Sequence, residues 1–146
     1  MIGILIVTHG KMAEGIADSA RMIMGNNEQF DSIGLFPDKD LDQFKADIKK
    51  KFLELDTGDG VIIFVDLFGA SPYNITALNL HELLSEKKKV RVITGVNLPM
   101  VIEVLNMRNI EENIDSLYKS CLTTGKDGIK ELLEEMASNE CEDDEE

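Results

Sequence analysis

The chain has 146 residues, enough for one domain with a hydrophobic core, and its 43% hydrophobic and 29% charged residues are typical of a globular protein. The formal net charge of −13 argues against nucleic-acid binding, which needs a basic face. No apolar run approaches the roughly 20 residues of a membrane span, and the N-terminus lacks the basic region of a signal peptide. Cys121 and Cys141 are far apart and form no metal or redox motif, so we expect reduced thiols in a cytoplasmic protein.

The first predicted element is a strand within residues 2–10, an apolar run that ends on His9. A run of mostly β-branched residues is typical of a strand buried on both faces. Further strands are predicted at residues 30–36, 61–65 and 90–94, and helices at 11–24, 40–55, 71–84, 99–107 and 110–122. We expect Asp40 and Ser71 to cap the helices that they begin, and Gly125 to end the last one. Residues 128–136 can form a helix or can begin as a strand.

Alternating strands and helices without an internal repeat predict an α/β fold. We expect a doubly wound, mainly parallel open sheet of four to five strands with helices on both faces. Right-handed crossovers place the carboxyl ends of all parallel strands at one edge, where open α/β sheets bind their ligands. His9, Pro37, Asp66 and Gly95 should therefore lie along that edge, and the function should be there too.

Three features of the sequence converge at this edge. His9 ends the first strand, Asp66 follows the third strand, and a loop through Gly69, Ala70 and Ser71 leads into a helix. A carboxylate beside an imidazole fixes the tautomer and leaves the other ring nitrogen free as a nucleophile or base. A glycine-containing turn before a helix offers backbone N–H groups to phosphate oxygens. Together these features indicate phosphoryl transfer to His9 through a covalent intermediate.

Other interpretations of the same residues have to be weighed. A histidine at a strand end can be a simple polar terminus, and an aspartate after a strand can cap the next turn. A metal site has little support, since one histidine and one carboxylate are too few ligands. Neither of the glycine-rich nucleotide-binding motifs is present. A Ser-His-Asp arrangement with Ser71 as nucleophile lacks the usual G-x-S-x-G turn.

Several segments, in this order, resemble one known family. They are Ile-Val-Thr-His-Gly at 6–10, Phe-Val-Asp-Leu-Phe-Gly-Ala-Ser-Pro-Tyr-Asn at 64–74, Thr-Gly-Val-Asn-Leu-Pro-Met at 94–100 and, more weakly, Thr-Gly-Lys-Asp-Gly at 124–128. The chain is similar to the mannose-type (mannose/fructose/sorbose) IIA component of the bacterial phosphoenolpyruvate-dependent sugar phosphotransferase system. The resemblance covers residues 1 to about 133.

The resemblance implies a phosphocarrier. His9 would accept a phosphoryl group from the phosphohistidine carrier protein HPr and pass it to a IIB component, which would phosphorylate sugar as it enters through the membrane components. Asp66 would orient His9, and Ser71 would contact the phosphate together with Gly10, Gly69 and Ala70. The resemblance calls for no cofactor or metal, and family members are homodimers in which a C-terminal strand can pair with the partner's sheet. That strand would come from about residues 128–132.

Further expectations concern the domain boundary near the C-terminus, the IIB component, the substitution at Ala70 and the alternative functions. We expect a IIA domain at 1–137 and a solvated, disordered tail at 138–146, whose last seven residues include six acidic ones. Many relatives continue into a fused IIB domain, whereas this sequence runs into an acidic tail. We therefore expect IIB to be a separate polypeptide here. Ala70 replaces a second glycine found in many members, and a small side chain there still lets the backbone approach a phosphate. A phosphoryl donor subunit of a dihydroxyacetone kinase and a regulatory domain that reports phosphorylation state remain alternatives.

Overall fold

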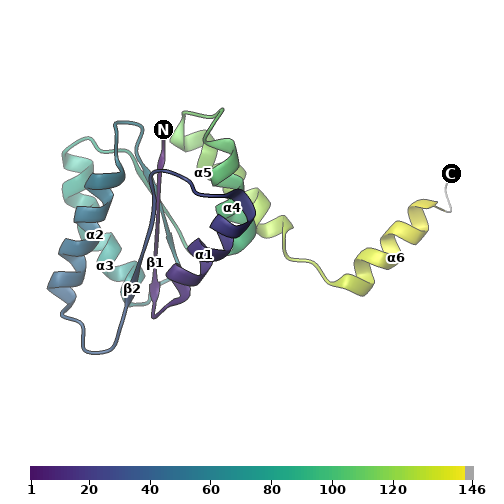
Figure 1. Cartoon of the computed structure of the whole chain (residues 1–146), viewed down its shortest axis with the longest axis horizontal. Coiled ribbons are helices and arrows are strands. Elements are labelled where there is room, and N and C mark those ends of the chain that lie inside the picture. The colour runs from purple at the N-terminus through teal and green to yellow at the C-terminus, as the bar shows by residue number, and fades with distance from the viewer. Residues whose placement is uncertain (144–146) are drawn as a thin grey trace.

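The computed structural model describes residues 1–143, in which strands and helices alternate as the sequence predicts (Figure 1). The strands are β1 (Gly3–His9), β2 (Phe30–Leu35), β3 (Val61–Val65) and β4 (Val90–Ile93). The helices are α1 (Met12–Met24), α2 (Leu41–Leu55), α3 (Ser71–Ser85), α4 (Leu98–Met107), α5 (Ile114–Asp127) and α6 (Leu132–Asp143). None of the helices within these residues is both long and apolar enough to cross a bilayer.

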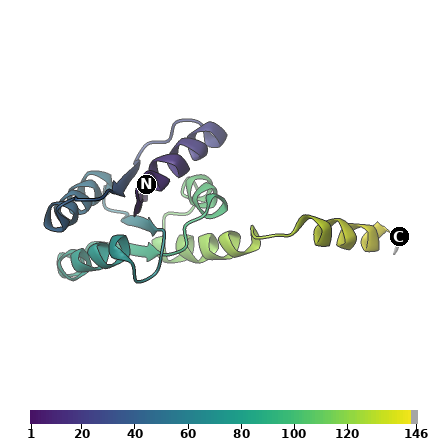
Figure 2. The same cartoon turned by 90° about the horizontal axis from the view of Figure 1, so that it is seen from below.

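The four strands form one open sheet in the order β2-β1-β3-β4, and every neighbouring pair is parallel. Helices α2 and α3 cover one face, and α1, α4 and α5 cover the other (Figure 2). Alternate residues of β1 enter the two cores, with Ile4 and Ile6 on one side and Leu5 and Val7 on the other. This arrangement confirms the predicted α/β doubly wound class and explains why residues 4–7 of β1 are all apolar.

The helix boundaries follow from local chemistry, with two corrections to the sequence prediction. Asp40 caps α2 as expected, because its carboxylate accepts a hydrogen bond from the Gln43 N–H at 2.8 Å. The prediction that α5 begins near residue 110 and is ended by Gly125 was wrong. Asn113 caps α5, and Gly125 lies buried inside the helix. A Cβ at Gly125 would lie 2.6 Å from the Met100 Cε, so the glycine allows α5 to pack closely on α4.

The chain leaves the domain after α5 in a segment that we call the C-terminal arm, residues 129–143. The arm projects away from the sheet and its covering helices (Figures 1 and 2). Residues 132–143 form α6, whereas residues 128–131 form neither helix nor strand in this single chain, and there is no fifth strand among the described residues. Part of the predicted disordered tail is therefore helical to residue 143, while residues 144–146 lie outside the described part. The domain boundary at 137 stays a prediction.

Candidate functional site

The sheet order brings two distant residues to its topological switch point. From β1 the chain crosses over to β2 on one side, whereas β3 lies on the other side of β1. Such a point opens a crevice at the carboxyl edge of the strands, where ligands of open α/β proteins bind. His9 is the last residue of β1, and Asp66 directly follows β3. They are 57 residues apart in the chain but in direct contact in the fold.

The contact between His9 and Asp66 has a defined geometry. The carboxylate oxygen Oδ2 of Asp66 lies 2.6 Å from the ring nitrogen Nδ1 of His9 and also accepts the backbone N–H of His9 at 2.9 Å. The other oxygen, Oδ1, accepts the N–H of Leu67 at 2.9 Å. An ionised carboxylate can only accept hydrogen bonds, so Nδ1 carries a proton and Nε2 keeps its lone pair.

The environment keeps Asp66 ionised and leaves the imidazole accessible. Burial by itself would raise the pKa of the Asp66 carboxyl. The hydrogen bonds from the His9 backbone and ring, the attraction of the imidazole and the Leu67 N–H outweigh it, and they hold that pKa below its usual value. The Asp66 side chain is 11% exposed, whereas the His9 side chain is 51% exposed. The less exposed aspartate is held in place by its hydrogen bonds, and the histidine is the part of the pair that a second molecule can reach.

Two residues next to His9 support its position, and the sequence prediction did not single them out. The buried Thr8 hydroxyl accepts the Ala13 N–H at 2.8 Å at the start of α1 and donates to the His9 carbonyl at 3.0 Å. In β2, a Cβ at Gly34 would lie 2.0 Å from the carbonyl oxygen of Gly10. Only glycine lets β2 approach the turn after His9 this closely. The sequence signal for Thr8 is its place in the Ile-Val-Thr-His-Gly motif, which was quoted without a role for the threonine, and Gly34 has no signal.

The loop between β3 and α3 carries the predicted phosphate contacts Gly69, Ala70 and Ser71. Gly69 has a φ of +78°, a left-handed conformation that favours glycine. The Asn74 side chain, which sequence reasoning quoted without a role, donates to the Gly69 carbonyl at 2.9 Å and holds the loop against α3. The prediction that Ser71 caps α3 was wrong: Ala70 is the N-cap, and Ser71 is already helical with its side chain exposed.

The structure therefore brings the predicted site residues to one edge but does not join all of them. Among the described residues, Asp66 is the one hydrogen-bond partner of the His9 ring. Ser71 and the backbone of Gly69 and Ala70 follow Asp66 on the same loop without a hydrogen bond to the imidazole. Gly10 follows His9 with a φ of +53°. His81 is exposed on α3 and takes no part in this arrangement.

Exposed apolar side chains lie at the same edge of the sheet as His9. Four large apolar side chains lie exposed in the segments that follow β1, β2 and β3 at the same edge, and they are Met12, Phe36, Leu67 and Phe68. No group of three or more His, Cys, Asp or Glu side chains within residues 1–143 could hold a metal ion. The site consists of an oriented imidazole and a short loop ahead of a helix, at an edge of the sheet that also exposes apolar side chains.

The fold and the site together define a class of protein: a doubly wound α/β protein with a histidine at its switch point that a carboxylate orients. Comparison with known proteins identifies the family within this class. A family model described as the fructose IIA component of the phosphotransferase system (PTS) matches residues 3–122. The chain belongs to this family, the mannose/fructose/sorbose family of IIA components of the PTS, as its sequence motifs predicted.

Individual relatives agree with this assignment. The chain is 33% identical over 131 residues to the mannose-specific EIIAB component of Escherichia coli K12, covering 90% of this chain but 39% of that protein. It thus spans about two fifths of the length of that relative. It is 30% identical over 142 residues to the sorbose-specific EIIA component of Lacticaseibacillus casei, covering 97% and 98% of the two chains. A crystal structure of a phosphotransferase system component EIIA from Streptococcus agalactiae superposes with a TM-score of 0.81 at 27% identity, covering 90% of this chain and 98% of that one.

Proposed function

We propose that the protein is a phosphocarrier in which His9 accepts a phosphoryl group from HPr and passes it to a IIB component during sugar uptake. The observation that carries this proposal is the 2.6 Å contact between His9 Nδ1 and the Asp66 carboxylate. It holds the ring in one tautomer and leaves Nε2 as the nucleophile, on a side chain that a partner protein can reach. The names of the relatives, which refer to mannose, fructose and sorbose, favour sugar transport over the dihydroxyacetone kinase alternative.

The transfer balances with the groups present. The Nε2 lone pair of His9 forms a bond to the phosphorus of the donor's phosphohistidine. The phosphorus–nitrogen bond of the donor breaks, and its electron pair returns to the donor ring. The His9 ring becomes positively charged while Nδ1 keeps its proton, and the Asp66 carboxylate beside that proton compensates the new charge. Transfer to IIB repeats the same exchange, with His9 as the leaving group.

The loop before α3 supplies candidates for holding the phosphoryl group. The first turn of an α-helix has N–H groups without intrahelical partners, and its dipole favours an anion. Pro72 has no N–H, so Ser71 and Tyr73 offer the first backbone donors of α3, and Ser71 adds a hydroxyl. In this proposal the Gly69 N–H is a further donor to the phosphate oxygens. The N–H groups of Gly10 and Ala70 donate to the Leu35 and Leu67 carbonyls at 2.8 and 3.3 Å, so these two small residues would contribute by letting the phosphoryl group approach the backbone closely.

The partners in the proposal are proteins, and the surface around His9 is suited to that. Exposed apolar side chains that gather into a patch on a soluble protein mark a protein contact site. HPr and IIB would dock in turn on this surface, in the cytoplasm.

We also propose a homodimer in which residues 128–132 of one chain pair with β4 of the other. The outer side of β4 has no neighbouring strand among the described residues, which supports this pairing.

The decisive test is direct phosphorylation. The protein is incubated with phosphoenolpyruvate, enzyme I and HPr, and its intact mass is measured. We expect one acid-labile phosphoryl group on the wild type and on His81→Ala, and none on His9→Ala. Label that persists in His9→Ala would overturn the assignment. Phosphorus NMR of the labelled protein then identifies the ring nitrogen, for which we expect Nε2.

A further inference from the structure

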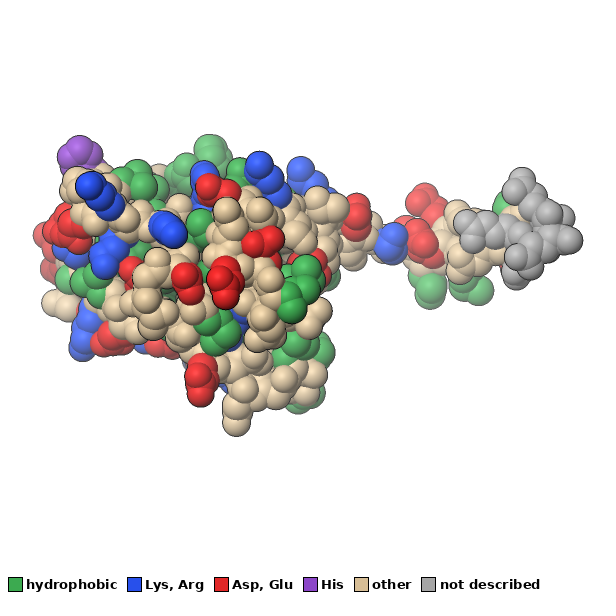
Figure 3. All heavy atoms as spheres, turned by 90° about the horizontal axis from the view of Figure 1, so that it is seen from above, with side chains coloured by type: hydrophobic (Ala, Val, Ile, Leu, Met, Phe, Trp, Pro, Cys, Tyr) green, Lys and Arg blue, Asp and Glu red, His purple; other side chains and the backbone are tan. Residues whose placement is uncertain are grey.

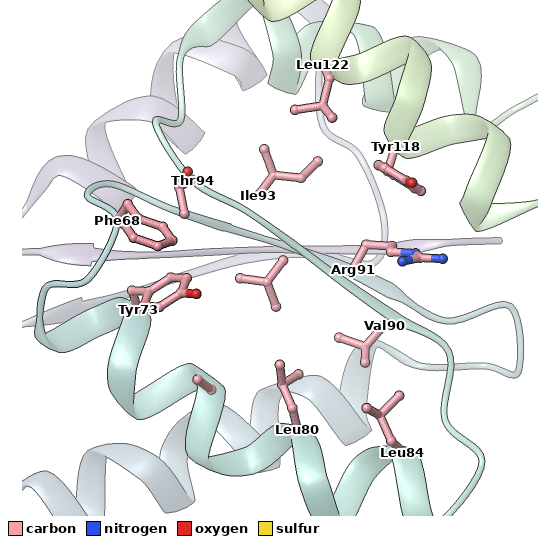
Figure 4. Close-up of a pocket in the computed structure, with 12 residues that line it drawn as sticks. Phe68, Tyr73, Leu80, Leu84, Val90, Arg91, Ile93, Thr94, Tyr118 and Leu122 are labelled. Atoms are coloured by element: carbon pink, nitrogen blue, oxygen red, sulfur yellow. The ribbon is translucent and has the colours of Figure 1, made fainter.

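The turn between β4 and α4 lies beside the candidate site. Thr94 in this turn and Phe68 in the loop after Asp66 line one hollow (Figure 4). Two residues further on, the N–H of the buried Val96 donates to the Val65 carbonyl at 3.2 Å. That carbonyl belongs to the planar peptide group that joins Val65 to Asp66. The turn therefore holds the peptide group from which the Asp66 side chain projects.

Asn97, the last residue of this turn, is held at both ends of its carboxamide. Its Oδ1 accepts the Met100 N–H at 3.1 Å and so caps α4, and its Nδ2 donates to the Gly125 carbonyl at 2.9 Å. Gly125 is in the last turn of α5, where the carbonyls of a helix have no intrahelical donor, and Asn97 supplies one. Because Val96 and Asn97 are adjacent, fixing Asn97 between two helices also fixes the direction of the Val96 N–H.

The end of α5 is shaped to receive the start of α4. A Cβ at Gly125 would lie 2.6 Å from the Met100 Cε, and a Cβ at Gly128 would lie 2.7 Å from the Pro99 Cγ. Both glycines therefore let the two helix ends pack closely, just before the C-terminal arm leaves the domain (Figure 3). Two of the segments that resemble the family, for which the proposed function has no role, thus form one contact beside the site.

We propose that Asn97 is a positioning residue for phosphoryl transfer at His9. Asn97 fixes the turn, and the Val96 N–H then holds the peptide group before Asp66. The Asp66 carboxylate in turn keeps its 2.6 Å contact with Nδ1 of His9. Small displacements of a group that orients a reacting atom are costly, even when they start at a residue outside the site. The inference rests on the proposed phosphocarrier function and adds to it a residue that lies outside the His9–Asp66 pair.

The first experiment observes the His9 ring by nitrogen NMR, without any phosphorylation. His9 and His81 are the two histidines of the chain, so a sample with isotope-labelled histidine gives two sets of ring signals, and His81 serves as an internal reference. At a pH where the ring is neutral, we expect the wild type to show a protonated Nδ1 and an unprotonated Nε2 for His9. In Asn97→Ala the two nitrogen shifts of His9 should move towards each other, because a ring without a fixed partner exchanges between its tautomers.

The matched control for this measurement is Asn113→Ala. It removes an asparagine cap at the other end of α5 and should leave the His9 signals unchanged. Unchanged His9 shifts in a folded Asn97→Ala protein would overturn the proposal. Asn97→Asp carries the test if that variant does not fold, because a carboxylate still caps α4 but cannot donate to Gly125, and the same change in the shifts is expected.

The second experiment measures the rate at which HPr phosphorylates His9. Asn97→Ala should lower the maximal rate about three- to tenfold and leave the HPr concentration for half of that rate unchanged, whereas Asn113→Ala should keep the wild-type rate. Because Asn97 acts through Asp66, adding Asn97→Ala to Asp66→Asn should slow transfer no further than Asp66→Asn alone. Effects that multiply, or a wild-type rate in Asn97→Ala, would refute the route through Asp66. If the wild type itself is not phosphorylated, the phosphocarrier function fails, and the nitrogen shifts still decide whether Asn97 positions the His9–Asp66 pair.

Discussion

Replacing Asp66 by asparagine should slow phosphoryl transfer to His9 by about five- to twelvefold. The carboxylate accepts three hydrogen bonds, two of them from His9 through the same oxygen. Hydrogen bonds to a charged group contribute about 1.5–3 kcal/mol and neutral ones about 0.5–1.5 kcal/mol. The neutral amide therefore removes about 1–1.5 kcal/mol of stabilisation from the ring as it becomes positively charged, and each 1.36 kcal/mol is about tenfold in rate.

The assay is a time course with radiolabelled phosphoenolpyruvate, enzyme I and HPr, with the amount of IIA protein varied. Asp40→Asn is the matched control, because it removes one carboxylate at the same edge while its amide oxygen can still cap α2. We expect the control to transfer at the wild-type rate. An Asp66→Asn protein that is folded and as fast as the wild type would refute the orienting role of this carboxylate.

The same substitution should change how stability depends on pH. The pKa of Asp66 is lower in the folded chain than in the unfolded chain, where it is about 3.9. Its ionised form therefore stabilises the fold at pH values above the unfolded pKa, and that contribution is lost as the pH falls through the folded pKa. Denaturation curves of the wild type and Asp66→Asn should differ most near neutral pH and converge in acid. A difference that grows towards low pH would contradict this assignment.

Three further predictions concern the support of the site and the two thiols. Gly34→Ala should destabilise the fold by about 1–3 kcal/mol and slow phosphorylation, because its Cβ would meet the Gly10 carbonyl; urea denaturation and the transfer assay measure the two effects. Thr8→Val should cost about 1–3 kcal/mol in urea denaturation, since it leaves a buried N–H at the start of α1 unpaired, whereas Thr8→Ser should not. Burial raises the pKa of the Cys121 thiol to about 12, so alkylation at pH 8 should label Cys141 alone, and Cys121 only in denaturant.

Much of the fold could be predicted because the relevant signals are local. Apolar residues at every second position, or in an unbroken run, indicate a buried strand. Apolar residues that recur about every 3.6 positions indicate the buried face of a helix. The strands and the first helices were placed in this way, and Asp40 was recognised as a cap. Gly125 misled the prediction because glycine serves both as a helix stop and as a point of close packing, and only the position of Met100 distinguishes the two.

For the candidate site, the sequence predicted a shared edge of the sheet and a carboxylate beside the imidazole, but not the geometry of the contacts. A histidine and an aspartate at two strand ends indicate a shared edge of the sheet. Whether they touch depends on the strand order, which places β3 directly beside β1. The supporting contacts of Thr8 and Gly34 were missed, since each depends on a neighbour that sequence patterns do not position.

By itself, the sequence determined the alternating strands and helices, the apolar character of β1 and the family motifs around His9. These follow from the secondary-structure preferences and the side-chain chemistry of each segment, which do not depend on where the segment lies in the fold. Only the tertiary structure decided that Asp66 lies 2.6 Å from the His9 ring and that the buried Arg108 binds the Ile2 carbonyl across 106 residues. It also decided that Phe68, in the loop between β3 and α3, lines an open groove beside β4. Contacts of this kind depend on how distant segments pack, because burial selects the strand order and the crossovers that satisfy the whole chain at once.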